Sequence, residues 1–241
     1  MPSSHFMNIA HRGASSYAPE NTFASFDKAL ELGTAHIEFD LHFSADGHIV
    51  VIHDDTVDRT TDGSGAVADL TLAQLRSLDA GAWFSTVYAG AVIPTLAGLL
   101  ERYKGRFHFH IEIKGKTPGL SQRTADLVRG FGVKDSVTIT SFDPGSLEEL
   151  APYAPELPRG WLVRELNDST VARAQEMGLT LLCPHADAVT PEVVQDLHGK
   201  GFTVRAWGIA GQELMRRVVD AGADGATVNF PDKLDAYLKG L

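Results

Sequence analysis

Residues 35–55, AHIEFDLHFSADGHIVVIHDD, carry the pattern that decides the fold of this chain. In an extended strand successive side chains point to opposite faces. One face of the first half carries three apolar side chains, Ile37, Phe39 and Leu41. The other face carries two imidazoles and two carboxylates, His36, Glu38, Asp40 and His42. Because groups of that kind are rarely buried without a specific role, we predict that this face forms a functional site.

The second half of the stretch predicts a hairpin. Asp46-Gly47 is a strong signal for a two-residue turn, and the β-branched run that follows favours an antiparallel return strand. With residues 45 and 48 flanking the turn, His53 would return beside Asp40, and a turn of a different length would place it beside Glu38. Either register brings a histidine against a pair of carboxylates.

The composition restricts the partners. The net charge is −10 and there is no basic run, which argues against nucleic acid or an anionic membrane as the main partner. An anionic substrate would therefore need a local positive charge. The apolar share of 44% and the charged share of 22% are typical of a globular protein. The single cysteine, Cys183, permits no internal disulfide and is predicted to be a buried apolar residue.

No targeting or membrane segment is expected. The first ten residues, MPSSHFMNIA, lack the basic region and the apolar core of a signal peptide. No apolar run approaches the ~20 residues of a membrane span. We therefore expect a cytoplasmic protein without integral membrane association, and the sequence does not indicate its oligomeric state.

Strand-like and helix-like segments alternate along the chain. The predicted strands begin near Met7, Ala35 and Phe107 and continue at 137–141, 160–163, 180–183, 203–207 and 225–228. Eight parallel strands that alternate with helices indicate an α/β fold, the TIM (β/α)8 barrel. Residues 56–94 break this pattern and are predicted to form a small insertion over one mouth of the barrel, within a single domain spanning 1–241.

In such a barrel the active site lies at the C-terminal ends of the strands. Six polar or aromatic side chains are predicted to lie late in their strands: His11, Glu38, Asp40, Glu112, Lys114 and Trp207. The alternation and the fold class therefore predict the same place for the site. The earlier strand histidines, together with His42, are expected to be hydrogen-bonded in the barrel core.

The three acids of this set predict a metal site. Carboxylates as close as Glu38, Asp40 and Glu112 would be cannot all stay ionised without a cation, and they suit Mg²⁺ or Ca²⁺. The alternative is a set of buried ion pairs with Arg12 and Lys114. Such pairs repay their desolvation poorly, and two cations cannot neutralise three acids. We therefore expect one divalent cation.

Histidines and fixed charges complete the predicted site. His11 and His53 would flank the cation and could divide general acid and general base duty. Arg12 and Lys114 would hold a phosphoryl group and its developing charge. Together these groups indicate phosphoester cleavage. An amidohydrolase barrel is the nearest alternative, but its chemistry requires two histidine ligands where the first strand offers His11-Arg12.

An ordered set of short motifs resembles the glycerophosphodiester phosphodiesterase family. The motifs cover nearly the whole chain: His11-Arg12-Gly13, Pro19-Glu20-Asn21-Thr22, Glu38-x-Asp40, His53-Asp54, Arg59-Thr60-Thr61, Ile93-Pro94-Thr95-Leu96, Glu112-Ile113-Lys114, Trp207, Asp224-Gly225 and Pro231-Asp232. Each motif alone is weak, but the ordered set is highly specific.

The resemblance implies metal-dependent cleavage of a glycerophosphodiester to sn-glycerol 3-phosphate and an alcohol such as choline or ethanolamine. It implies a cation on the three acids, with His11 and His53 as the acid–base pair and Arg12 and Lys114 on the phosphate. In the related barrel phospholipases a neighbouring hydroxyl of the substrate attacks phosphorus and water opens the cyclic phosphate. Trp207 and Phe23 would line the glycerol side, with Trp83 over the mouth. Glu20 and Asn21 are expected to cap the first helix and to fix Arg12.

Two departures from the family pattern stand late in the chain. Gly208-Ile209-Ala210 replaces the usual Thr-Val-Asn, and Asn229-Phe230 stands where an aspartate usually precedes Pro-Asp. We expect both to affect substrate preference and not the reaction class. Two alternative functions stay open at this point. One is a lysophospholipase D acting on a single-chain lipid, and the other is a non-catalytic barrel that binds phosphorylated ligands.

Overall fold

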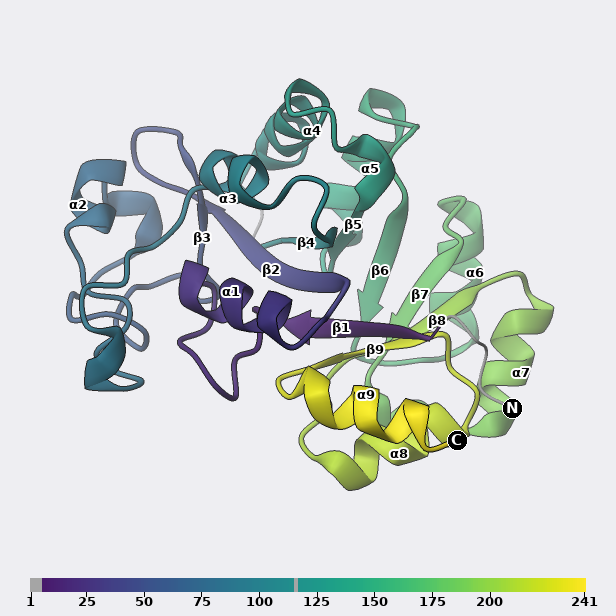
Figure 1. Ribbon diagram of the computed structural model, residues 1–241. Coiled ribbons are helices and arrows are strands. Elements are labelled where there is room, and N and C mark those ends of the chain that lie inside the picture. Colours follow the sequence, from purple (N-terminus) through teal and green to yellow (C-terminus); the bar gives the residue numbers. More distant parts are fainter. Residues whose placement is uncertain (1–5, 115–116) are drawn as a thin grey trace.

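Eight parallel strands form a closed barrel in the computed structural model, which describes residues 6–114 and 117–241 (Figure 1). The strand order is β1-β9-β8-β7-β6-β5-β4-β2, and β1 pairs with β2 to close the ring. The barrel strands are β1 (Met7–His11), β2 (His36–Phe43), β4 (His108–Ile113), β5 (Val137–Ser141), β6 (Arg159–Val163), β7 (Leu181–Pro184), β8 (Thr203–Ala206) and β9 (Gly225–Val228). The predicted TIM (β/α)8 barrel is therefore confirmed.

Helices surround the barrel (Figure 1). They are α1 (Phe23–Glu31), α3 (Leu96–Tyr103), α4 (Leu120–Gly130), α5 (Pro144–Tyr153), α6 (Asp168–Glu176), α7 (Pro191–Gly199), α8 (Gln212–Asp220) and α9 (Pro231–Lys239). Several begin at a residue whose side chain accepts from the first turn, as Asn167 does from the Thr170 N–H and Thr190 does from the Val193 N–H. Among the described residues no helix is both long enough and apolar enough to cross a membrane.

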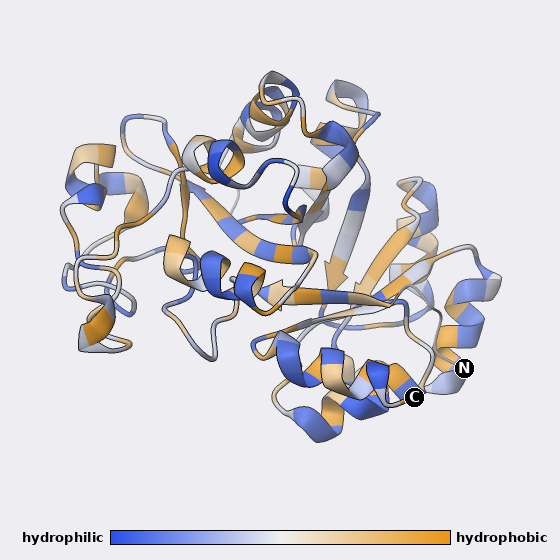
Figure 2. Ribbon diagram, in the orientation of Figure 1, coloured by the Kyte–Doolittle hydropathy of each residue, from blue (hydrophilic) through white to orange (hydrophobic). Residues whose placement is uncertain are grey.

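The hydrophobic core lies between the outer face of the barrel and the helices. Figure 2 shows the alternation along β2 as successive hydrophobic and hydrophilic bands. Ile37, Phe39 and Leu41 of β2 are fully buried, and the rings of Phe39 and Phe26 on α1 pack edge to face at a centroid distance of 6.0 Å. This packing fixes the phase of β2. The polar residues of the strand must therefore point into the barrel.

The hairpin exists, but its predicted register was wrong by one position. Strand β3 (Ile49–Val51) pairs with β2 outside the ring, with Val51 opposite Leu41. The turn has three residues, because the Ser44 N–H donates to the His48 carbonyl, and Gly47 takes a left-handed φ of +78°. The ladder ends where the Ile52 N–H donates to the Asp40 carbonyl at 3.1 Å, and His53 follows directly.

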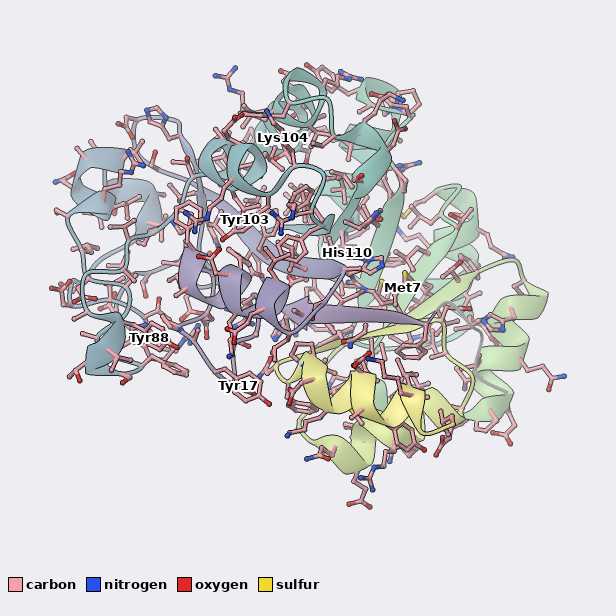
Figure 3. All side chains as sticks on the ribbon, viewed as in Figure 1. Met7, Tyr17, Tyr88, Tyr103, Lys104 and His110 are labelled. Atoms are coloured by element: carbon pink, nitrogen blue, oxygen red, sulfur yellow. The ribbon has the colours of Figure 1, made fainter. Side chains whose placement is uncertain are left out.

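The insertion folds around a small hydrophobic cluster of its own, which includes Val57, Val67, Leu75 and Ile93. It contains α2 (Leu72–Arg76) and lies beside β2 and β3 (Figure 1). Tyr88 connects it to the barrel, because its hydroxyl donates to the Tyr17 carbonyl at 2.9 Å (Figure 3). Trp83 packs on Phe84 and donates to the Ala80 carbonyl. It lines neither cavity at the barrel mouth, so the expectation that Trp83 covers the mouth is not supported.

Candidate active site

The strand register brings the predicted acids together. Asp40 on β2 lies beside Glu112 on β4, and Glu38 lies beside His11 on β1. Neighbouring residues of parallel strands point to the same face, so these side chains share the C-terminal end of the barrel interior. One oxygen from each of Glu38, Asp40 and Glu112 lies within 4.8 Å of the others. The three residues are 3%, 0% and 7% exposed.

Two cationic side chains reach these acids. The Lys114 ammonium lies 2.6 Å from Glu112 and 3.2 Å from Asp40. Arg12 places Nε 3.4 Å from Asp40, and its Nη1 donates to Glu20 at 2.9 Å. The Arg12 backbone N–H donates to Glu38 at 3.1 Å, in a left-handed turn (φ +56°) just after β1. The expectation that Glu20 fixes Arg12 is confirmed.

The carboxylates carry more negative charge than these cations compensate. Burial, reinforced by Asp40 and Glu112, raises the pKa of Glu38 well above its ordinary value. Burial and the Asp40 charge raise the pKa of Glu112 to about 7. Burial acts in the same direction on Asp40, but Lys114 and Arg12 outweigh it and lower the pKa of that carboxyl. Asp40 thus contacts both cationic side chains, whereas the Glu112 carboxylate is paired with Lys114 alone among the described residues.

The residues present fit a divalent cation. Within the described part of the chain, the Oδ1 atom of Asp40 is buried and accepts no hydrogen bond, although Lys114 lies near it. Three carboxylates from two rigid strands form an all-oxygen donor set of the kind that hard cations prefer. Arg12 divides its charge between Asp40 and Glu20, so an arrangement made only of ion pairs leaves acid uncompensated. Glu38, Asp40 and Glu112 are therefore the residues that could hold the cation.

His11 has a neutral partner. Its Nδ1 lies 2.6 Å from the Asn229 amide oxygen, and its Nε2 lies 4.0 Å from Glu38. Since the amide oxygen only accepts, Nδ1 carries the proton and Nε2 keeps its lone pair. Burial and the Arg12 charge lower the pKa of His11 to about 4. The ring is therefore neutral and suited to accept a proton.

His53 has a charged partner. Its Nδ1 lies 2.6 Å from Asp54, whose carboxylate also accepts from the Arg59 Nε at 2.6 Å. Arg59 reaches back to Glu20 with bonds of 2.7 and 2.9 Å, which connects the insertion to the Arg12 side of the site. Burial lowers the pKa of His53, while the Asp40 and Asp54 carboxylates act in the opposite direction. The Asp54 carboxylate orients the ring and can stabilise its protonated form.

Two cavities meet at the acidic cluster. The larger, about 420 Å³, opens at the His53 side, and His53, Lys114, Phe142 and Arg164 are among the residues that line it. The second, about 250 Å³, lies at the His11 side, and its walls include Arg12, Leu162, Arg205 and Trp207. Glu112 and Phe142 line both. A substrate with its reacting atom at the carboxylates could thus extend into both cavities, with one imidazole on each side.

Of the two aromatic residues predicted to contact the substrate, one lines a cavity of the site and the other does not. Trp207 follows β8, lines the second cavity and donates its indole N–H to the Val163 carbonyl at 3.2 Å. Phe23 begins α1, where it packs on Tyr103 of α3 at a centroid distance of 6.3 Å, under the Arg102 guanidinium. The interpretation of Phe23 as a wall of the glycerol side is therefore not supported. The phase of α1 turns this ring toward a neighbouring helix and away from the mouth.

Two asparagines belong to the site in ways that the sequence did not indicate. Asn21 was expected to cap α1, but it adopts φ +55° and donates to Asp40 at 2.8 Å. Asn229 was expected to affect only substrate preference, yet it contacts His11 directly. The Pro-Glu-Asn-Thr motif marked Asn21 as notable without giving its partner. Nothing in the local sequence connects Asn229 to a residue 218 positions earlier.

Replacing Asn21 by Ala is expected to destabilise the protein by about 2–3 kcal/mol. The change removes a hydrogen bond to a buried carboxylate, which costs about 1–3 kcal/mol, and puts a β-carbon residue with no local hydrogen bond in the left-handed region. Asn21→Gly is the matched control, because it loses the bond without the backbone cost and should be about 1 kcal/mol more stable than Asn21→Ala. Urea unfolding of the three proteins measures both values. Equal stability of the two variants would contradict the backbone argument.

Among the histidines of β2 and β4, three precede Asp40 or Glu112 on their strands, as predicted, and one does not. His36, His108 and His110 occupy earlier positions on β2 and β4, toward the N-terminal end of the barrel. His42 follows Asp40 and lies beyond the acids, where its Nε2 contacts the His53 carbonyl at 3.1 Å. The expectation that His42 lies deeper than the site was wrong, although it is hydrogen-bonded as predicted.

Comparisons with known proteins agree on one family. The family model of the glycerophosphoryl diester phosphodiesterase family matches residues 11–233. A glycerophosphodiester phosphodiesterase of Caldanaerobacter subterraneus is 38% identical over 230 residues, which cover 94% of this chain and 95% of that protein. An Oleispira antarctica phosphodiesterase, solved in complex with the product sn-glycerol-3-phosphate, superposes with a TM-score of 0.90 at 30% identity and 96% coverage of both chains. An Agrobacterium tumefaciens glycerophosphodiester phosphodiesterase gives a TM-score of 0.83 at 30% identity, covering 95% of this chain and 98% of that one.

Proposed function

The chain belongs to the glycerophosphoryl diester phosphodiesterase family, and from this premise we propose that it hydrolyses glycerophosphodiesters to sn-glycerol 3-phosphate and an alcohol. One observation carries the proposal. Three buried carboxylates, Arg12 and Lys114 meet at the C-terminal end of the barrel, with His11 and His53 at the two cavities on either side. Such a site suits the reaction centre of a phosphodiester, which is flanked by two different alcohol groups.

The proposed cofactor is one divalent cation, Mg²⁺ or Ca²⁺, held by Glu38, Asp40 and Glu112. When bound, it would polarise a phosphoryl oxygen and offset the charge of the transition state. Lys114 and Arg12 flank the same position and supply fixed positive charge there. Because the net charge of −10 repels an anionic substrate, these local charges are needed for its capture.

We assign different duties to the two histidines, because they line different cavities. We place the glycerol group in the second cavity, beside His11 and Trp207, and the leaving alcohol in the first, beside His53. His11 Nε2 accepts the proton of the glycerol hydroxyl next to the ester as that oxygen attacks phosphorus. His53 Nε2 donates a proton to the departing alkoxide. Water then opens the cyclic phosphate, with His53 accepting a water proton and His11 returning its proton to the glycerol oxygen.

The proposed activity is tested by incubating the protein with glycerophosphocholine and Mg²⁺ or Ca²⁺ and measuring sn-glycerol 3-phosphate. A panel with other head groups and with an acylated glycerophosphocholine separates this activity from lysophospholipase D. Release of sn-glycerol 3-phosphate from the soluble diesters supports the proposal. Tight binding without turnover of any diester would reject it in favour of a binding protein.

Replacing Asn229 by Asp is expected to move the acid limb of the kcat/KM profile to higher pH by about 1–2 units. A carboxylate that accepts from His11 Nδ1 favours the imidazolium, so the pKa of His11 rises from its lowered value. The base acts only when neutral, and activity is therefore lost at a higher pH as the solution is acidified. The profile is measured at saturating cation. Asn229→Ser is the neutral control, and an acid limb that stays in place in Asn229→Asp would contradict the assignment of His11 as the base.

A further inference from the structure

Arg205 is the largest fully buried side chain of the described protein, and the reaction proposed above does not use it. It lies on β8, is 1% exposed and lines the second cavity with Trp207. Among residues 6–114 and 117–241 no carboxylate oxygen lies within 4.0 Å of its guanidinium, and the nearby acid, Glu112, is paired with Lys114. A buried arginine is ordinarily paired with an acid, so this charge requires an explanation.

The one hydrogen bond that the structure shows for this guanidinium is to a neutral ring. Arg205 Nη1 lies 3.3 Å from Nδ1 of His110, whose ring is inside the barrel (Figure 3). A guanidinium only donates, so Nδ1 must accept and the His110 proton is on Nε2. Nε2 in turn lies 3.2 Å from Nδ1 of His36, to which it donates. The two histidines thus orient Arg205 without neutralising it.

A further donor of the guanidinium lacks an acceptor. Nε of Arg205 is buried and has no hydrogen-bond partner among residues 6–114 and 117–241. The other close polar neighbour is the thiol of Cys183, a weak acceptor. Burying a charge without a partner is costly, and proteins retain such groups where a ligand provides the missing acceptors. The cavity that Arg205 lines is where a ligand could do so.

The walls of this cavity define the ligand group. Phe142, Leu162 and Trp207 form an apolar side, and the Arg205 guanidinium supplies hydrogen-bond donors to the same cavity. A short polyol fits this combination, because its carbons contact the apolar wall while its oxygens accept from the guanidinium. We propose that Arg205 recognises the glycerol group of the substrate by donating to its hydroxyl oxygens. This inference rests on the proposed function, which places glycerol in the second cavity.

The test is the binding of two product analogues to wild type and Arg205→Met in the presence of Mg²⁺, by calorimetry. The probes are sn-glycerol 3-phosphate and n-propyl phosphate, which has the same carbon chain without hydroxyls. We expect Arg205→Met to weaken binding of sn-glycerol 3-phosphate by about 10–100-fold and to change binding of n-propyl phosphate less than 3-fold. Arg205→Lys, which keeps the charge but not the fork, should restore part of the difference. Arg129→Met, on the exposed surface, is the control that should match wild type.

Thermal unfolding separates recognition from a structural role. Removing a buried charge that lacks an acid partner should leave the Tm unchanged or raise it. Equal changes for both probes in Arg205→Met, or a lowered Tm with weaker binding of both, would overturn the proposal. If wild type turns over glycerophosphocholine and Arg205→Met discriminates between the probes as wild type does, only the role of Arg205 fails. If wild type hydrolyses no diester but the probe-specific loss appears, the proposed function fails and glycerol recognition stands.

Discussion

Glu112→Gln is expected to abolish tight binding of the divalent cation and to lower kcat/KM for glycerophosphocholine by a factor on the order of 10³. The substitution keeps the size of the side chain and removes one of three charges in a buried cluster. Two acids and the two cationic side chains would then be close to neutral. A divalent ion would no longer gain enough attraction to repay its dehydration.

The fold is expected to survive this change, which makes the loss informative. Burial and Asp40 raise the pKa of Glu112 to about 7, so the folded protein without a cation already opposes its ionisation. A neutral glutamine removes that repulsion, and unfolding without cation should occur at the same Tm or higher. The loss of activity would therefore reflect the site and not the stability of the barrel.

Calorimetry with Mg²⁺ and Ca²⁺, together with the turnover assay after chelator treatment, measures the effect. Glu101→Gln is the matched control, because Glu101 is an exposed acid of α3 paired with Lys104 and should behave as wild type. Cation affinity within 3-fold of wild type in Glu112→Gln would mean that the acids serve only as ion-pair partners of Lys114 and Arg12. Undiminished activity in chelator would remove the cation from the reaction.

The barrel and the acidic cluster could be predicted because the same local alternation of apolar and polar residues occurs in both strands that carry the acids. The alternation around Phe39 gives the phase of β2, and the same alternation around Ile111 gives the phase of β4. Parallel pairing in a barrel then gathers the polar faces of the two strands at one end of its interior. A pattern with a period of two specifies the face that each side chain takes, and the register that sets Asp40 beside Glu112 is seen in the structure.

What could not be predicted depends on backbone conformations that local patterns do not specify. The Asp46-Gly47 pair is compatible with a two-residue or a three-residue turn, and the choice moved the register of β3 by one position. Asn21 contacts Asp40 because its backbone adopts the left-handed region, and the residue type alone does not show that conformation. Phe23 has the hydrophobicity of a pocket wall and of a helix contact alike. The direction of α1 decided between them.

The sequence also did not indicate the contacts of Asn229 and Arg205. Both residues meet partners that are distant in sequence because the barrel is closed. Asn229 follows β9 and reaches His11 because the last and first strands are neighbours. Arg205 stands in an ordinary-looking strand, VRAW, where alternation places its side chain inward without indicating a partner. Its role depends on His110, which is 95 residues away and itself looked like a core histidine. Contacts between residues so far apart in the sequence can be identified only from the structure.

Replacing His53 by Ala is expected to lower the rate at which choline is released from glycerophosphocholine in a single turnover by a factor on the order of 10²–10⁴, and to lower the release of p-nitrophenol from its glycerophosphodiester far less. His53 lies on the cavity assigned to the leaving alcohol, and Asp54 can stabilise its protonated ring. Choline departs poorly without a proton, whereas p-nitrophenolate is stable as an anion. The dependence on the leaving group therefore identifies the general acid.

His11→Ala should show the contrasting result, with a loss of about 10²–10⁴ on both substrates. His11 lies on the cavity that we assign to the glycerol group, and in the proposed reaction the attacking hydroxyl must lose its proton there whichever alcohol departs. His48→Ala is the control, because His48 lies in the hairpin turn with a largely exposed side chain and should leave both rates unchanged. Single-turnover kinetics of alcohol release by the three variants on the two substrates decide the assignment. A loss that depends on the leaving group in His11→Ala but not in His53→Ala would exchange the two roles, and small losses in both would place the proton transfers on other groups. The proposed placement of the diester predicts the first pattern, because His11 and His53 line different cavities.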